Sequence, residues 1–163
     1  MITWGKNRAL VDLLSASGAR FLVIGGTAVL FHAPERGTFD DLDLLLEPTE
    51  EAGGVLMTAM ERLGGPRILA TADQFAQPSK QVRERSFFYL DVLTPPLDFD
   101  FAEHWRRAEE ATMTCSSSRV RVASVHTLLL LLRLHKCTTA RITRDIELLE
   151  RAPAVPCAAT VGS

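Results

Sequence analysis

Cysteine is scarce in this sequence, and long apolar runs are lacking. The three cysteines, Cys115, Cys137 and Cys157, lie far apart, and none has a second cysteine at metal-ligand spacing. A disulfide framework and a zinc site are therefore both disfavoured, and a reducing cytoplasm is the expected location. The longest apolar run, Leu128 to Leu132, is far too short to span a bilayer. We therefore expect no membrane partner.

An excess of charge of one sign is also lacking. Lysine and arginine number 18 against 20 acids, for a net charge of -2, so no global basic field indicates nucleic-acid binding, although a local basic groove is compatible with this balance. The length of 163 residues, 47% of them hydrophobic, suffices for one core but not for two. We expect a single domain over residues 1–152 and a flexible, small-residue-rich tail over 153–163.

Hydrophobic periodicity and turn residues predict an alternation of helices and strands. We expect strands at 21–24, 42–46, 86–94 and 119–123, with a further one at 67–70, and helices at 6–17, 27–32, 49–63, 101–110, 125–136 and 142–151. The polar stretch 71–84 reads as an irregular lid or loop that could include a helical turn.

Acidic residues on two of these strands carry the chemistry. Asp41 and Asp43 project from one face of their strand, because side chains two apart share a face. Asp91 lies inside a strongly apolar strand, where an unpaired acid is costly to bury. Divalent cations commonly compensate such acids, since Mg²⁺ takes carboxylate and phosphate oxygens together. The alternative for each acid is a solvated or hydrogen-bonded surface residue.

A glycine pair stands at the turn between the first strand and the following helix. The amides of Gly25 and Gly26 can face a phosphate there, although a tight turn explains the pair equally well. A glycine turn beside three carboxylates is what metal-assisted nucleotidyl transfer requires. Arg36 could hold a phosphate through its planar fork, and Lys136 could approach a triphosphate. A solvated arginine and a helix-end lysine favoured by the dipole are the alternatives.

These segments resemble minimal nucleotidyltransferases of the DNA polymerase β superfamily, particularly those related to abortive-infection-type toxins. The resemblance spans residues 20 to 150, and its motifs are Gly25-Gly26-Thr27-Ala28, Arg36-Gly37-Thr38, Asp41-Leu42-Asp43 and Leu90-Asp91-Val92-Leu93-Thr94. It implies an α+β fold, the DNA polymerase β-like nucleotidyltransferase fold, with a mixed sheet, helices mainly on one face and further C-terminal helices. It also implies transfer of a nucleoside monophosphate from an NTP with release of pyrophosphate.

Two departures from the family pattern stand out. One extra residue separates Thr38 from the acid pair, so either a bulge absorbs it or Asp40 takes an unexpected part. Near the C-terminus Lys136, Arg141 and Asp145 echo a family pattern, but Asp145 is displaced by one position and Leu148 replaces an acid. Both departures favour the alternative of an inactive module that binds nucleotide or a protein partner.

The expected mechanism is in-line attack of an acceptor hydroxyl on the α-phosphate. Asp41, Asp43 and Asp91 would hold Mg²⁺, with Asp91 nearest the hydroxyl, while Gly25, Gly26 and Thr27 contact the distal phosphates. The acceptor is RNA, protein or a small molecule, and aminoglycoside-type transfer is a further alternative. A cognate antitoxin is the expected protein partner of a toxin.

Overall fold

A computed structural model describes residues 6–39, 41–112 and 118–153. Its elements follow one another in this order: α1 (Lys6–Ala16), β1 (Phe21–Ile24), α2 (Gly25–His32), the 3-10 turn η1 (Pro34–Arg36), β2 (Leu42–Leu46), α3 (Glu50–Arg62), the 3-10 turn η2 (Ala72–Ala76), β3 (Gln81–Glu84), β4 (Leu90–Leu93), α4 (Phe101–Arg107), β5 (Glu109–Thr112), β6 (Arg119–Val122), α5 (Val125–Arg133) and α6 (Ala140–Arg151). This composition is α+β, as expected.

The strands form one mixed sheet in the order β3-β4-β2-β1-β6-β5. β2 pairs parallel with β4, and β1 pairs parallel with β6, whereas the other neighbours are antiparallel. The four residues of β1 are all buried, and those of β2 are buried except for Asp43. An apolar central strand is expected where both faces of a sheet are covered. The single acid that breaks this pattern is therefore conspicuous.

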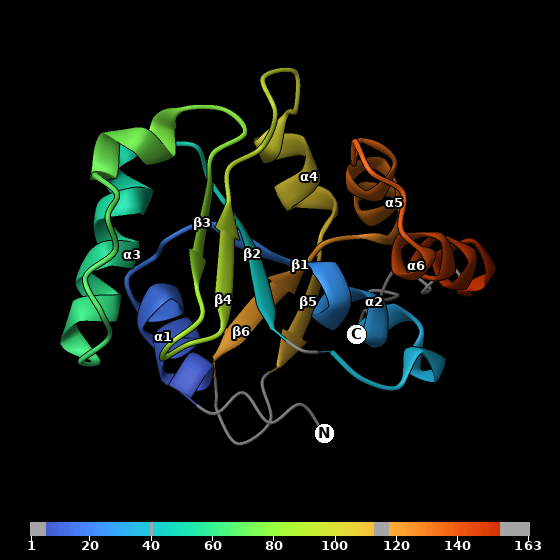
Figure 1. The fold of residues 1–163 in the computed structure, drawn as a ribbon, viewed down its shortest axis with the longest axis horizontal. Helices are drawn as coiled ribbons and strands as arrows, with labels where there is room; N and C mark the ends of the chain where they lie inside the picture. Colours follow the sequence, from blue (N-terminus) through green and yellow to red (C-terminus); the bar gives the residue numbers. More distant parts are fainter. Residues whose placement is uncertain (1–5, 40, 113–117, 154–163) are drawn as a thin grey trace, which may run out of the picture.

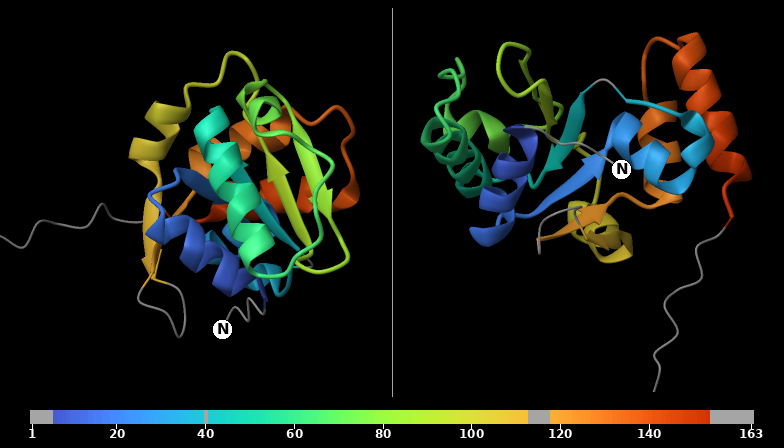
Figure 2. Two further views of the ribbon diagram at one scale, coloured as in Figure 1. Left: turned by 90° about the vertical axis from the view of Figure 1, so that its left-hand side faces the viewer. Right: turned by 90° about the horizontal axis from the view of Figure 1, so that it is seen from below.

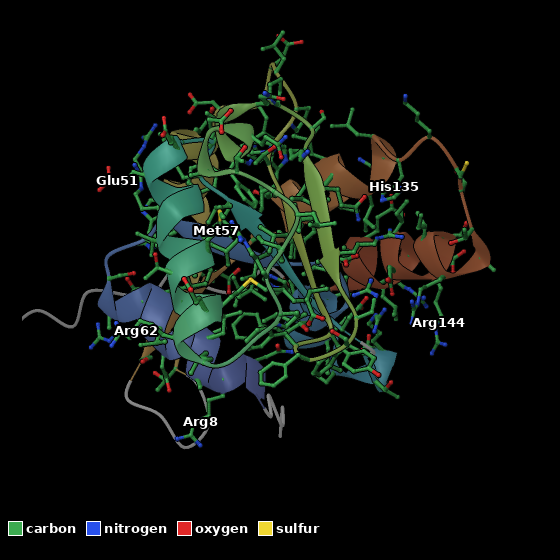
Figure 3. All side chains as sticks on the ribbon, turned by 60° about the vertical axis from the view of Figure 1, so that its left-hand side comes forward. Arg8, Glu51, Met57, Arg62, His135 and Arg144 are labelled. Atoms are coloured by element: carbon green, nitrogen blue, oxygen red, sulfur yellow. The ribbon has the colours of Figure 1, made fainter. Side chains whose placement is uncertain are left out.

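α1 and α3 lie on one side of the central strands and α2, α5 and α6 on the other, with α4 apart from both groups (Figure 1). α1 contacts α3, and α2 contacts both α5 and α6. The view from below shows the same separation, with β1 and β2 between the groups (Figure 2). Figure 3 shows the same two sides, marked by Glu51 of α3 and Arg144 of α6. The core is continuous across the sheet, since Leu10 of α1, Leu44 of β2 and Leu128 of α5 are all buried within it. The described helices are all too short or too polar to cross a bilayer.

Two segments near the sheet edge differ from expectation. Residues 67–70 form no strand, and Leu69 is fully exposed. β4 pairs instead with β3, a strand inside the segment 71–84 that was expected to be an irregular lid or loop. The helical turn expected in that segment is present as η2, which packs on α3. An edge strand with one half-buried apolar residue, Val82, lacks the pattern that reveals a central strand.

Three expected elements are shorter than predicted. The strand expected from residue 86 begins at Leu90, because Ser86 to Phe88 form a turn around a buried carboxylate, described below. The helix expected to reach Glu110 ends at Arg107, because Glu109–Thr112 pairs with β6 as a strand. The helix expected to reach Lys136 ends at Arg133, after which the chain turns toward Thr139, whose side chain caps α6. The expected tail lies almost wholly outside the described residues.

Candidate active site

The two glycines at the start of α2 are required by close approach of other side chains. Gly25 has a positive φ of 60°, and a Cβ there would lie 1.9 Å from Oδ2 of Asp43. A Cβ on Gly26 would lie 2.9 Å from the guanidinium of Arg36. The amide of Gly26 donates to the Asp43 carboxylate. The glycine pair therefore lets an acid and an arginine reach the N-terminus of α2.

Three carboxylates converge at this end of the sheet. β2 and β4 run parallel with Asp43 opposite Asp91 in the register, so both side chains project from the same face. Asp41 precedes β2 by one residue and lies on the same side. One carboxylate oxygen from each of the three acids lies within 4.8 Å of the other two. The structure thus brings together the three acids that the sequence pattern selected.

The electrostatics of the cluster oppose full ionisation of the metal-free protein. Burial, together with the charges of Asp41 and Asp91, raises the pKa of Asp43 to about 7, against the lowering effects of Arg85 and the Gly26 amide. Oδ1 of Asp91 is buried and accepts no hydrogen bond of good geometry within the described part of the chain. An all-oxygen donor set with such an orphaned oxygen fits a hard divalent cation such as Mg²⁺.

Two arginines that the sequence did not single out also reach the acids. Arg85 Nη2 lies 3.0 Å from Asp41 Oδ2 and 2.8 Å from Asp91 Oδ1. The contact with Asp91 is an ion pair and not a hydrogen bond, since Oδ1 of Asp91 accepts no hydrogen bond from the described residues. Arg83 Nε lies 3.3 Å from Asp91 Oδ2. The sequence alone did not indicate these contacts. They can be deduced only once β3 is known to be a strand, because its pairing with β4 sets Arg83 opposite Asp91.

The turn that carries Arg85 is organised by the buried side chain of Glu84. Its carboxylate accepts the amides of Ser86, Phe87 and Phe88 and the hydroxyl of Ser86. Burial opposes the charge of Glu84, but the Phe88 amide and the other donors together outweigh it and lower its pKa to about 2. A non-glycine residue with positive φ, Tyr89, closes the turn. The turn is therefore fixed by a charged acceptor at its base.

Replacing Glu84 by glutamine should destabilise the protein by about 3 kcal/mol, because a neutral amide cannot accept all these donors and charge-assisted bonds are the strong ones. A lowered pKa means that the carboxylate stabilises the fold above its ordinary value of 4.5, and that this stabilisation falls away as the pH drops toward 2. Urea denaturation at pH 7 and pH 3 measures both effects. Equal losses for Glu84→Gln and for the exposed-site variant Glu61→Gln would contradict this role.

Arg36 is held by an acid from the C-terminal helix. Its Nε lies 2.8 Å from Asp145 Oδ1 and its Nη2 lies 3.2 Å from Asp145 Oδ2, which makes a bidentate pair. The side chains are 7% and 8% exposed. A further nitrogen of Arg36 donates to the carbonyl of Thr38. In this structure Arg36 thus braces the loop before β2 against α6, and its expected phosphate contact stays a prediction.

Thr27 and Lys136, two further residues for which the sequence predicted contacts with phosphate, lie in different parts of the fold. Thr27 lies in the first turn of α2 and is buried, and its hydroxyl has no hydrogen-bond partner among the described residues. Lys136 lies in the exposed turn between α5 and α6 and takes no part in the ion pairs of the site that the described residues form. Asp40, between Thr38 and the acid pair, lies outside the described residues.

Solved structures similar to this chain include nucleotidyltransferases. The solution structure of the antibiotic-resistance factor ANT(2'')-Ia matches with a TM-score of 0.50 at 14% identity, covering 88% of this chain and 80% of that one. The chain has the nucleotidyltransferase fold. The same ANT(2'')-Ia crystallised with adenylyl-2''-tobramycin gives a TM-score of 0.49 at 13% identity over 87% of this chain and 84% of that one.

A third similar structure is an antigenic nucleotidyltransferase-like protein from Paracoccidioides brasiliensis. It gives a TM-score of 0.45 at 17% identity and covers 88% of this chain and 74% of that one. Comparison of the sequence with protein-family models and with curated proteins gives no match. At these identities the nucleotidyltransferase fold is what the comparisons establish.

Proposed function

We propose that this protein is a metal-dependent nucleotidyltransferase that moves a nucleoside monophosphate from an NTP to an acceptor hydroxyl. The observation that carries the proposal is the convergence of Asp41, Asp43 and Asp91, with one oxygen of each within 4.8 Å of the others, on the nucleotidyltransferase fold. Even with Arg85 beside the cluster, the pKa of Asp43 is raised to about 7, so three carboxylates at this spacing are costly to keep ionised. This cost favours a functional origin over a structural one.

Asp41, Asp43 and Asp91 are the residues that would hold Mg²⁺, which when bound neutralises charge on the transferring phosphate. Asp91, the most buried of the three, is the candidate for orienting the attacking hydroxyl and taking its proton. Asp43 lies against Gly25, so the first turn of α2 and the acids form one continuous surface. Thr27 brings a buried hydroxyl without a partner to that turn, which supports a contact with phosphate.

The alternative of an inactive, nucleotide-binding module loses part of its support. It rested on the extra residue before Asp41 and on the missing C-terminal acid, in whose place Leu148 stands. The three acids converge in spite of the extra residue, so the first of these two supports is weakened. We therefore favour an active enzyme.

The acceptor is proposed as a class, namely RNA, protein or a small molecule. A small-molecule acceptor is a specific candidate because the antibiotic-resistance factor ANT(2'')-Ia shares the fold. We also propose a role as a toxin with a cognate antitoxin, which the sequence resemblance supports. A cytoplasmic location is proposed as well, and the scarcity of cysteine is compatible with it.

The proposal is tested by incubating the protein with Mg²⁺ and α-labelled NTPs against total RNA, lysate protein and an aminoglycoside panel. We expect label transfer to one of these classes with release of pyrophosphate, and a loss on the order of 10³-fold in Asp91→Asn. Asp98→Asn is the matched control, since it removes an exposed acid outside the cluster. Calorimetric NTP binding without any pyrophosphate release would instead identify the inactive module.

A further inference from the structure

The guanidinium of Arg85 occupies the position of a cation between two acids. Its Nη2 alone contacts an oxygen of Asp41 at 3.0 Å and an oxygen of Asp91 at 2.8 Å. Those two acids, with Asp43, are the ones whose oxygens could share a metal ion. A divalent ion binds carboxylate oxygens at roughly 2.1 Å. An ion placed between Asp41 and Asp91 would therefore compete with the guanidinium nitrogen that contacts both.

The base of Arg85 is fixed, whereas its tip is free to move outward. The neighbouring Glu84 accepts the amides of the following turn, which sets where the Cα of Arg85 lies. The side chain of Arg85 is 42% exposed, in contrast with 6% for Asp91. The guanidinium can therefore leave the acids for solvent or a ligand while remaining beside the site.

Arg83, on β3 two residues before Arg85, provides an internal comparison. Of the three acids it contacts only Asp91, at 3.3 Å, and its side chain is 64% exposed. It adds positive charge to the cluster without bridging two acids. A general electrostatic effect should thus appear at both arginines, whereas occupation of a metal position should be specific to Arg85.

We infer that Arg85 is a built-in counter-ion that divalent metal must displace from Asp41 and Asp91, and that the displaced guanidinium then binds the NTP phosphates. The inference rests on the proposed function, because it assumes that the three acids take metal. A planar guanidinium pairs with phosphate oxygens through two parallel hydrogen bonds. Arg85 therefore pairs with carboxylates before the metal binds and with the NTP phosphates afterwards. Because each ligand frees or uses the same guanidinium, metal and nucleotide favour each other's binding.

The first test measures Mn²⁺ binding without nucleotide, by electron paramagnetic resonance of the free ion. Arg85→Gln should bind Mn²⁺ roughly tenfold more tightly than the natural protein, because the competing charge pair is gone. Arg83→Gln should change the affinity less than about threefold, since only screened, longer-range charge is lost. Arg85→Lys, which keeps the charge without the fork, should lie in between.

The second test measures ATP binding at saturating Mg²⁺ by calorimetry. Arg85→Gln should lose roughly tenfold in ATP affinity, whereas adenosine, which lacks phosphate, should bind equally to both forms. Thermal unfolding in EDTA should show Arg85→Gln melting below the natural protein, with Mg²⁺ removing the difference. Tighter metal binding together with weaker ATP binding is a combination that a merely structural arginine does not produce.

The outcomes separate this inference from the proposed function. If Arg85→Gln and Arg83→Gln alter Mn²⁺ affinity equally, or not at all, while the natural protein binds the ion, the counter-ion role is wrong and the metal site stands. If ATP affinity is unchanged in Arg85→Gln, the phosphate contact is wrong. If neither the natural protein nor Arg85→Gln binds Mn²⁺, the metal site and both proposals built on it fail.

Discussion

Replacing Asp43 by asparagine is expected to stabilise the metal-free protein at pH 8 while abolishing its binding of divalent metal. Burial, with the charges of Asp41 and Asp91, raises the pKa of Asp43 from 3.8 to about 7. An acid with a raised pKa in the folded state stabilises the fold below its unfolded value, and that stability is lost as the pH rises through the folded value. Asparagine cannot ionise, so Asp43→Asn should raise the free energy of unfolding by roughly 3 kcal/mol at pH 8.

Urea denaturation in EDTA at pH 4 and pH 8 measures the effect. The gain should be large at pH 8 and close to zero at pH 4, where folded Asp43 is already protonated. Asp98→Asn should give no gain at either pH, since this acid is exposed and outside the cluster. In Mg²⁺ the natural protein should be more stable than Asp43→Asn, because only the natural protein binds the ion. A variant that is less stable at pH 8 in EDTA would show that Asp43 is a structural acid.

The carboxylates could be predicted from the sequence because two local patterns coincide there. Side chains in a strand alternate between faces, so the spacing of Asp41 and Asp43 places both on one side without any knowledge of the tertiary fold. Asp91 stands out because the residues around it are apolar. Pairing of β2 with β4 was not readable from the sequence, yet the parallel register that sets Asp43 opposite Asp91 is what makes these acids one site.

The positive half of the site could not be predicted in the same way. Arg83 and Arg85 lie in a polar stretch, and β3 is an edge strand with two of its four residues exposed, so neither periodicity nor hydrophobicity indicated a strand there. The turn after β3 depends on Glu84, whose role as an acceptor of three amides emerges only in the folded chain. Phe87 and Phe88 extended the apparent strand into that turn because they are aromatic.

The contact of Arg36 with Asp145 shows a different limit of prediction from the sequence. The two residues lie 109 positions apart in the chain, and no local pattern connects a loop arginine with an acid on a distant helix. The sequence predicted a phosphate contact for Arg36, whereas Asp145 only echoed a family pattern at a displaced position. The structure instead pairs them, because α6 packs against α2 and η1.

Breaking this pair should have the largest effect on stability of any single ion pair among the described residues. Arg36→Ala or Asp145→Ala leaves one buried charge without its partner, since both side chains are less than a tenth exposed. The expected cost is roughly 3–5 kcal/mol for each variant. Arg133→Ala is the matched control, because Arg133 and Glu150 join α5 to α6 through a pair that is 58% and 50% exposed. Its expected cost is less than about 1 kcal/mol.

A double-mutant cycle over Arg36→Ala and Asp145→Ala decides whether the pair acts as a unit. The double variant should be little worse than either single one, because removing the second charge also removes the penalty of leaving it unpaired. Additive losses would show that each residue acts through separate contacts, such as that of Arg36 with the Thr38 carbonyl. Arg36 also lies over Gly26, where α2 begins beside Asp43. Loss of the brace should therefore weaken Mn²⁺ binding in Asp145→Ala, although Asp145 contacts none of the three acids directly.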